Sequence, residues 1–167
     1  MTADGTSPAD TLDLLIVGAG FGGLCMLQKA RAMGLSALVL EAAPSVGGTW
    51  YANRYPGARV DIQSLEYSFS FSEALQQEWQ WTERYASQPE LLRYANQVAD
   101  RFDLRSGIHL NTCVTAARFD DVNRRWEIGS TGEDGAALTW RARFVVLASG
   151  PLSTPNTPAF PRGPREG

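Results

Sequence analysis

The chain has 167 residues, of which 44% are hydrophobic and 20% charged, a composition typical of a single globular domain with its own core. Its net charge of −3 at pH 7 argues against a binding surface for nucleic acid or an anionic membrane. No apolar run approaches the roughly 20 residues of a membrane span. The first ten residues lack the basic start and apolar core of a secretory signal, so we expect a cytoplasmic protein.

The first predicted elements form a β–turn–α–β unit. Residues 1–11 are a polar tail that we expect to be disordered, and residues 12–17 are apolar enough for a strand that is buried on both faces. A helix follows to about Met33, with Gly34 in the position of a C-terminal cap. A second strand over residues 38–41 implies a parallel pair joined by a right-handed crossover.

Glycines fill the turn between the first strand and the helix. Gly18, Gly20 and Gly23 follow the pattern G-x-G-x-x-G. Gly18 permits a tight turn, Gly20 lets the backbone approach a pyrophosphate, and Gly23 lets the helix pack closely on the sheet. The diphosphate would bind N–H groups at the helix start, where the helix dipole favours negative charge. The turn therefore predicts a dinucleotide site.

An acidic residue indicates which dinucleotide binds. Glu41 lies at the end of the second strand, about 20 residues beyond the first glycines. Its carboxylate would accept hydrogen bonds from the hydroxyls of an adenosine ribose and would disfavour a 2′-phosphate. The first nucleotide is therefore expected to be FAD or NAD and not NADP.

Residues 42–71 hold more Gly, Pro, Trp, Tyr and Arg than a linker usually does, and loops of this length are commonly functional. The double glycine that ends at Gly48, followed by Thr49 and Trp50, suits close approach to a flat ligand beside an aromatic wall. In an extended segment Arg59 and Asp61 would point to the same side. They either serve a ligand or form a surface ion pair that contributes little.

The two cysteines and the one histidine carry no metal motif. Cys25 and Cys113 are far apart and have no partner at metal-ligand spacing, so we expect two reduced, buried, small apolar side chains. His109 belongs to an alternating stretch over residues 108–111 that is typical of a strand start. Its expected role is structural.

The rest of the chain predicts one further helix and a set of short strands. Ser87 and Glu90 have the spacing of a capping box, which predicts an amphipathic helix from about 88 to 102. Short antiparallel strands are expected over 112–119, 125–128 and 137–140, with turns near 121–123 and 132–135. An apolar return strand over 144–148 would end at Ser149 and Gly150, where the cofactor would lie.

The most specific signal is the run GTWYANRYPGARVDIQSLEYSFSF over residues 48–71. It closely resembles the N-terminal region of Baeyer–Villiger monooxygenases of the phenylacetone and cyclohexanone type. The similarity continues through residues 79–90, ends with 147–153 and covers nearly all of 12–161. The resemblance implies an α/β fold, a Rossmann-like FAD-binding domain with a parallel sheet and a small antiparallel β-meander. It also implies an enzyme that uses FAD, NADPH and O2 to convert a ketone into an ester or lactone.

The resemblance also assigns roles to residues. Val114 matches the position whose backbone meets adenine, and Arg59, Val60 and Asp61 resemble the edge of the NADP site. Asp61 is similar to the family aspartate that positions an arginine of the active site, which makes it the expected catalytic residue. The residues expected to contact a cofactor are Gly18, Gly20, Phe21, Gly22, Gly23, Glu41, Gly48, Thr49, Trp50, Arg59, Val60, Asp61, Tyr67, Val114 and Gly150.

The sequence departs from the family after residue 161, where an atypical tail over 162–167 replaces the family's continuation. The second glycine motif for NADPH is missing, and so are the His-bearing signature segment, the arginine that Asp61 would position and the last strand of the FAD domain. We therefore expect a truncated FAD-binding domain over 12–161 that holds FAD weakly and does not turn over ketones by itself. A missing C-terminal half would then be its partner.

Two other interpretations remain open. A related flavin monooxygenase that oxidises nitrogen or sulfur would share the same cofactor site. A non-catalytic nucleotide-binding module, which stands alone or complements a separately encoded half, would expose a hydrophobic surface where further strands should pack.

Overall fold

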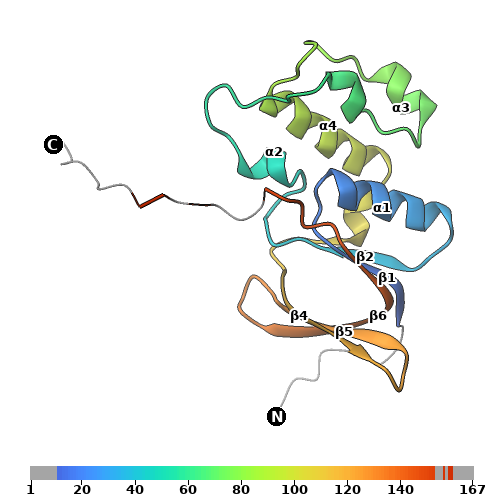
Figure 1. The fold of residues 1–167 in the computed structure, drawn as a ribbon. Coiled ribbons are helices and arrows are strands. Elements are labelled where there is room, and N and C mark those ends of the chain that lie inside the picture. Colours follow the sequence, from blue (N-terminus) through green and yellow to red (C-terminus); the bar gives the residue numbers. More distant parts are fainter. Residues whose placement is uncertain (1–10, 153–155, 157, 160–167) are drawn as a thin grey trace.

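The computed structural model describes residues 11–152, 156 and 158–159. Residues 1–10 of the tail predicted over 1–11, the tail predicted over 162–167 and the domain boundary predicted at 161 lie outside the described residues. Within them one six-stranded sheet has the order β3-β2-β1-β6-β5-β4 (Figure 1). Its strands are β1 (Leu12–Val17), β2 (Ala37–Leu40), β3 (Ile108–His109), β4 (Cys113–Asp120), β5 (Arg125–Thr131) and β6 (Ala137–Leu147).

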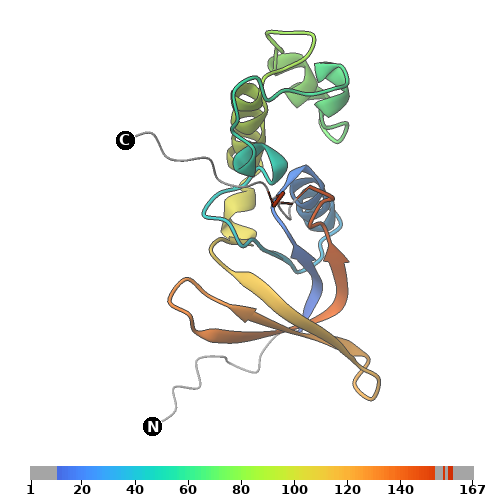
Figure 2. The same cartoon turned by 60° about the vertical axis from the view of Figure 1, so that its left-hand side comes forward.

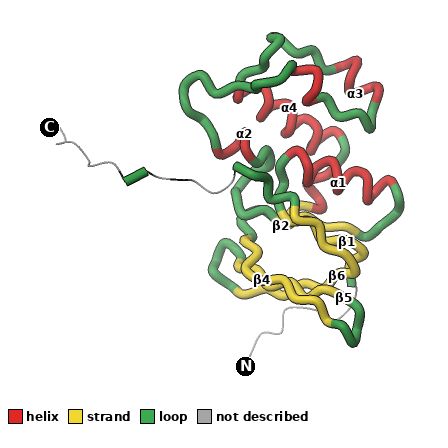
Figure 3. Tube along the Cα trace, viewed as in Figure 1, coloured by secondary structure: helices red, strands yellow, loops and turns green. Residues whose placement is uncertain are grey.

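The helices follow the order of the predicted pattern, with short additions. The α-helices are α1 (Phe21–Ala32), α2 (Thr49–Ala52), α3 (Glu73–Glu78) and α4 (Gln88–Arg101), and the 3-10 turns are η1 (Ser64–Tyr67) and η2 (Leu104–Gly107). Figure 3 separates them from the strands by colour, with the helices gathered on one side of the sheet. Residues 53–87, called the excursion below, carry η1 and α3 beyond α4 and away from the sheet (Figures 1 and 2).

The predicted fold class is confirmed. β3, β2, β1 and β6 are parallel, whereas β6, β5 and β4 form an antiparallel meander. The parallel half and the meander are parts of one sheet because β6 belongs to both.

The predicted split of β6 into two strands is wrong. Residues 137–142 pair antiparallel with β5, and residues from Ala142 to Leu147 pair parallel with β1. The apolar pattern breaks at Arg141 and Arg143, which are exposed, but the backbone stays extended through the change of partner. A single strand of 11 residues therefore replaces the two predicted ones.

Two apolar clusters bury both faces of β1, as its sequence predicted. Leu14 and Ile16 pack with α1 and α4 on one face. Leu15 lies on the other face, against Leu40, Ile128 and the meander. The meander covers that face because it curls back beneath the parallel strands (Figure 1). Alternate residues of one strand thus point into two cores, as the two-residue period of a strand requires.

The ends of α1 and α4 test the capping predictions differently. Gly34 follows α1 with φ 72°, the left-handed conformation expected of a C-terminal cap. The capping box at α4 is wrong, because the Ser87 side chain makes no capping bond. The Glu90 carboxylate instead accepts hydrogen bonds of 2.9 Å from the backbone N–H and the hydroxyl of Thr82. The excursion passes over the start of α4, so the Glu90 carboxylate bonds to Thr82 of the excursion instead of to the first N–H groups of its own helix.

The burial expected of the cysteines is wrong for Cys113 and only partly right for Cys25. Both thiols are free; Cys113 is exposed and Cys25 is half-buried. Cys113 begins the edge strand β4, whose residues are mostly exposed because no helix covers the meander there.

Candidate functional site

The glycine-rich turn lies where β1, β2 and β6 end together. The Gly18 N–H donates to the Leu40 carbonyl at 2.8 Å, and the Ala148 N–H donates to the Val17 carbonyl at 2.8 Å. Gly18 has φ 103°, and a Cβ there would lie 2.7 Å from the Ala148 carbonyl oxygen. Three carboxyl ends of parallel strands therefore meet at one turn, the place where open α/β sheets bind ligands.

Gly23 fixes how closely α1 approaches this turn. A Cβ on Gly23 would lie 1.9 Å from the Gly18 carbonyl oxygen, a distance that no side chain can occupy. The neighbouring Gly22 has ordinary space, since its Cβ would lie 3.9 Å from the Cβ of Ala148. Gly20 is the N-cap of α1, and no side chain caps the first turn of this helix. Its leading N–H groups thus remain available for an anion.

A second pair of glycines meets the first. The Gly47 N–H donates to the Ala19 carbonyl at 3.0 Å, and a Cβ on Gly48 would lie 2.9 Å from the Cα of Gly20. Gly47 and Gly48 have φ of 121° and 54°, which side chains rarely adopt. The two backbones touch without side chains between them, and together they form a narrow cradle.

Glu41 lies beside this cradle and organises its backbone. Its Oε2 accepts a hydrogen bond from the Ala19 N–H at 2.6 Å, and its Oε1 accepts one from the Ala43 N–H at 2.8 Å. A carboxylate has about four acceptor positions, so it can hold these two N–H groups and still accept from ribose hydroxyls. The Glu41 carbonyl also accepts the Thr112 N–H at 2.8 Å, which brings β4 and Val114 close to the same corner.

Aromatic rings connect the cradle to α2 and the excursion. Phe21 lies edge-on to Tyr67 at 5.5 Å between ring centroids, and Tyr67 lies edge-on to Trp50 at 5.8 Å. Phe21 also packs at 6.0 Å from the buried ring of Tyr94 in α4. Phe21, Trp50 and Tyr67, which were selected from the sequence, are therefore neighbours.

Arg59 and Asp61 do not form the ion pair that the sequence left open. The Arg59 guanidinium pairs with Glu83 at 3.1 Å and donates to the Tyr85 carbonyl at 3.2 Å. Val60 is buried and pairs through its N–H with the Ala86 carbonyl. Asp61 is exposed and lies near enough to Tyr67 to act on its phenol. Burial raises the pKa of Tyr67, and the negative charge of Asp61 raises it further.

The charge of Asp61 provides a direct test of this arrangement. Replacing Asp61 by asparagine is expected to lower the pKa of Tyr67, although burial should keep it above the ordinary value. NMR titration of carbon-labelled tyrosine rings would measure it. Glu66→Gln is the matched control, because it removes the same charge next to Tyr67 in sequence and should leave that pKa unchanged. A pKa that is equal in Asp61→Asn and in the unchanged chain would contradict the placement.

The remaining predicted residues lie at the edges of the site. Gly150 follows β6 with φ 72° and lies two residues beyond Ala148. Thr49 is the first residue of α2 and follows Gly48 directly. No group of three or more His, Cys, Asp or Glu side chains that could hold a metal is found in the described part of the chain.

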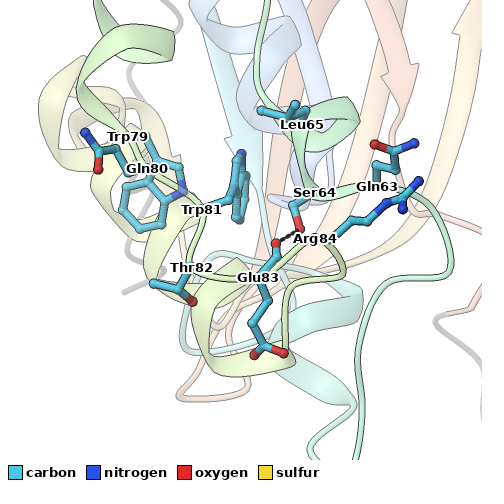
Figure 4. A pocket seen from close by; sticks show the side chains of 9 residues that line it. All are labelled: Gln63, Ser64, Leu65, Trp79, Gln80, Trp81, Thr82, Glu83 and Arg84. Carbon is cyan, nitrogen blue, oxygen red and sulfur yellow. Dashed lines mark hydrogen bonds between the residues drawn. The ribbon is translucent and has the colours of Figure 1, made fainter.

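The sequence did not predict a separate hollow in the excursion. Its volume is about 480 Å³, and Figure 4 shows its lining side chains: Gln63, Ser64, Leu65, Trp79, Gln80, Trp81, Thr82, Glu83 and Arg84. The Ser64 hydroxyl closes one side by donating to the Glu83 carbonyl at 2.7 Å (Figure 4). This hollow lies in the excursion and does not include the glycine cradle.

The fold and the cradle define a dinucleotide-binding α/β domain. A family model described as an NAD(P)-binding Rossmann-like domain matches residues 16–80. Three curated monooxygenases match about nine-tenths of the chain. They are the 2-oxo-Δ3-4,5,5-trimethylcyclopentenylacetyl-CoA monooxygenase of Pseudomonas putida at 42% identity, the methyl acetate-forming acetone monooxygenase of Gordonia sp. (strain TY-5) at 42%, and a phenazine N-monooxygenase of Lysobacter antibioticus at 41%.

The three alignments include 91%, 90% and 89% of this chain. They include only 27%, 28% and 27% of the lengths of the three relatives. Among solved structures, an oxidized steroid monooxygenase bound to NADP superposes with a TM-score of 0.84 and 50% identity, over 90% of this chain and 28% of that one. A structure of OTEMO in complex with FAD and NADP superposes with a TM-score of 0.81 and 42% identity, over 92% of this chain and 28% of that one. Over about nine-tenths of its own length the chain is similar to flavin monooxygenases of the Baeyer–Villiger type, and it spans little more than a quarter of their length.

No helix in the described ranges is long and apolar enough to cross a membrane.

Proposed function

We propose that this chain is the FAD-binding portion of an FAD- and NADPH-dependent Baeyer–Villiger monooxygenase. The observation that carries the proposal is the contact between Gly20 and Gly48 at the uncapped start of α1, with Glu41 beside it. A diphosphate fits such a cradle because the two glycine backbones approach without side chains between them and no side chain caps the N–H groups at the start of α1. Relatives that match the chain oxidise small ketones or were solved with FAD and NADP, which supports the same assignment.

The residues divide between the two ends of the cofactor. Gly18, Gly20, Gly22 and Gly23 would hold the diphosphate, and Glu41 would accept from the adenosine ribose. The flavin end would contact Gly48, Thr49 and Trp50, together with Phe21 and Tyr67. The backbone of Val114 would contact adenine. Gly150 would line the edge of the site where β6 ends. When bound, FAD supplies the redox and oxygen chemistry of the reaction, and this chain binds and orients it.

Asp61 is the residue of this chain that we assign to catalysis. It is exposed beside Tyr67, so it is free to contact a group from another part of the protein. We propose that it positions an arginine of the active site, and that Arg59 and Val60 form one edge of the NADPH site. The ketone and the nicotinamide would bind mainly to residues beyond this chain.

The rest of the protein is expected to pack against β6. Within the described residues, the part of β6 from Arg143 to Leu147 pairs only with β1, so its other edge is open. Phe144 and Leu147 on this part are 60% and 72% exposed. An open edge beside exposed apolar side chains is suited to accept a further strand. We propose that this strand comes from the C-terminal region that the relatives possess, within a cytoplasmic enzyme that binds neither nucleic acid nor membrane.

Titration of FAD into the purified chain tests the cofactor assignment. We expect saturable quenching of flavin fluorescence that is lost in Gly20→Asp, because the added carboxylate would repel the diphosphate at the helix start. Ala74→Asp, which adds the same charge to the exposed surface of α3, is the matched control and should bind like the unchanged chain. Absence of binding to the unchanged chain would refute the proposal.

A second candidate activity is the oxidation of nitrogen or sulfur. The match to a phenazine N-monooxygenase favours it, because this chain is nearly as similar to that enzyme, at 41% identity, as to the acetone monooxygenase, at 42%. Product analysis with the full-length protein, offered a ketone and an aromatic amine, separates the two activities.

A further inference from the structure

Gln88 is a buried polar residue outside the set selected from the sequence. It is the first residue of α4 and only 8% exposed. Its side-chain Nε2 donates a hydrogen bond to the Trp50 carbonyl, and its backbone N–H donates to the Ala58 carbonyl at 2.9 Å. One residue thus holds two segments that are eight residues apart in sequence.

Both segments carry proposed site residues. Trp50 belongs to α2 together with Thr49, and Ala58 immediately precedes Arg59. Arg59 forms an isolated antiparallel bridge with Ser87, next to Gln88, and the Val60 N–H donates to the Ala86 carbonyl. The start of α4 is therefore the support on which the flavin-end segment and the proposed NADPH edge meet.

The short helix α2 depends on contacts with the start of α4 because it is too short to hold a fixed position by itself. It has four residues, none of them buried, and no side chain caps its start at Gly48. The side chains of Asn53 and Arg54 donate to the carbonyls of Thr49 and Tyr51, but both residues directly follow the helix and do not tie it to α4. A single helical turn is unstable by itself in water. Gly47 anchors the segment before α2 to Ala19, whereas the Gln88 bond anchors the carbonyl within it.

We propose that Gln88 is a positioning residue of the FAD site, which orients Thr49 and Trp50 toward the flavin end of the cofactor through the Trp50 carbonyl. This inference rests on the proposed FAD binding. The adenosine end is held by the glycine turn and Glu41, which Gln88 does not contact. Loss of the Gln88 bond therefore weakens recognition of the flavin half and leaves recognition of the adenosine half intact.

The test compares FAD with ADP as ligands of the full chain. Gln88→Glu keeps the shape of the side chain, replaces the donor by an acceptor and suits a helix start, so it should fold. We expect the Kd for FAD to rise by about three- to tenfold, the equivalent of one hydrogen bond, with the Kd for ADP unchanged. The visible circular dichroism of bound flavin should also change, since it reports the orientation of the ring.

Gln88→Met provides a second, uncharged variant and should give the same pattern. Gln97→Met on the exposed face of α4 is the matched control and should change neither Kd. An unchanged Kd for FAD, or equal losses for FAD and ADP, would overturn the inference. If the unchanged chain binds ADP but not FAD, or neither, the proposed function itself fails, which is a different result.

Discussion

Replacing Gly23 by alanine is expected to lower the free energy of unfolding by about 3 kcal/mol or more and to abolish FAD binding. The new Cβ would lie 1.9 Å from the Gly18 carbonyl oxygen. That oxygen belongs to the backbone of the glycine turn, so the collision is relieved only if α1 moves away from β1. Urea unfolding should show a large loss, and the melting temperature should fall by about 10 °C.

The neighbouring glycine is the control for this prediction. Gly22→Ala places its Cβ 3.9 Å from that of Ala148, an ordinary contact, in the same helix and one residue away. Alanine favours a helix by up to about 1 kcal/mol relative to glycine, so the stability should stay equal or rise. Equal stabilities for Gly22→Ala and Gly23→Ala would show that the close approach of α1 to the turn is not required.

Replacing Glu41 by glutamine should weaken FAD binding more than tenfold and destabilise the chain by about 2 kcal/mol. The carboxylate accepts N–H groups on both of its oxygens, from Ala19 and Ala43. An amide has one oxygen, so one of these N–H groups would face an NH2 group instead. The ribose would lose a charged acceptor at the same time. Calorimetric FAD titration and urea unfolding measure the two effects.

Glu73→Gln removes an equal charge from an exposed position at the start of α3 and serves as the comparison. It should change FAD affinity less than twofold and stability by less than about 0.5 kcal/mol. If Glu41→Gln behaves like Glu73→Gln, Glu41 neither organises the cradle nor contacts the ribose.

Local signals were sufficient to predict the first third of the fold. Apolar residues at 12–17, the glycines and the cap at Gly34 each act over a few positions, and the structure confirms the strand, turn and helix that they predicted. The β–turn–α–β unit also predicts the parallel pairing of β1 and β2, and the turn residues later in the chain predict the antiparallel strands of the meander.

Features that depend on distant partners could not be predicted in the same way. The Glu90 carboxylate accepts a hydrogen bond from Thr82 and does not cap its own helix, and Arg59 pairs with Glu83, which is 24 residues away. The apolar pattern of β6 breaks at the point where its partner strand changes from β5 to β1, so the pattern alone predicts two strands. The role of Gln88 has no local signal, since the carbonyl that it binds belongs to Trp50 in the short helix α2, 38 residues earlier.

The position of β1 between β2 and β6 has a consequence for the order of events during synthesis. β2 follows β1 within about 20 residues, but β6 reaches it only near residue 142, and Arg143 pairs with Asp13 across 130 positions. At ribosomal rates one side of β1 stays unpaired for on the order of ten seconds after β2 has emerged. Such long-range parallel pairing is slow. The nascent chain therefore presents an apolar strand with one unpaired edge to chaperones or to other nascent chains until β6 has been synthesised.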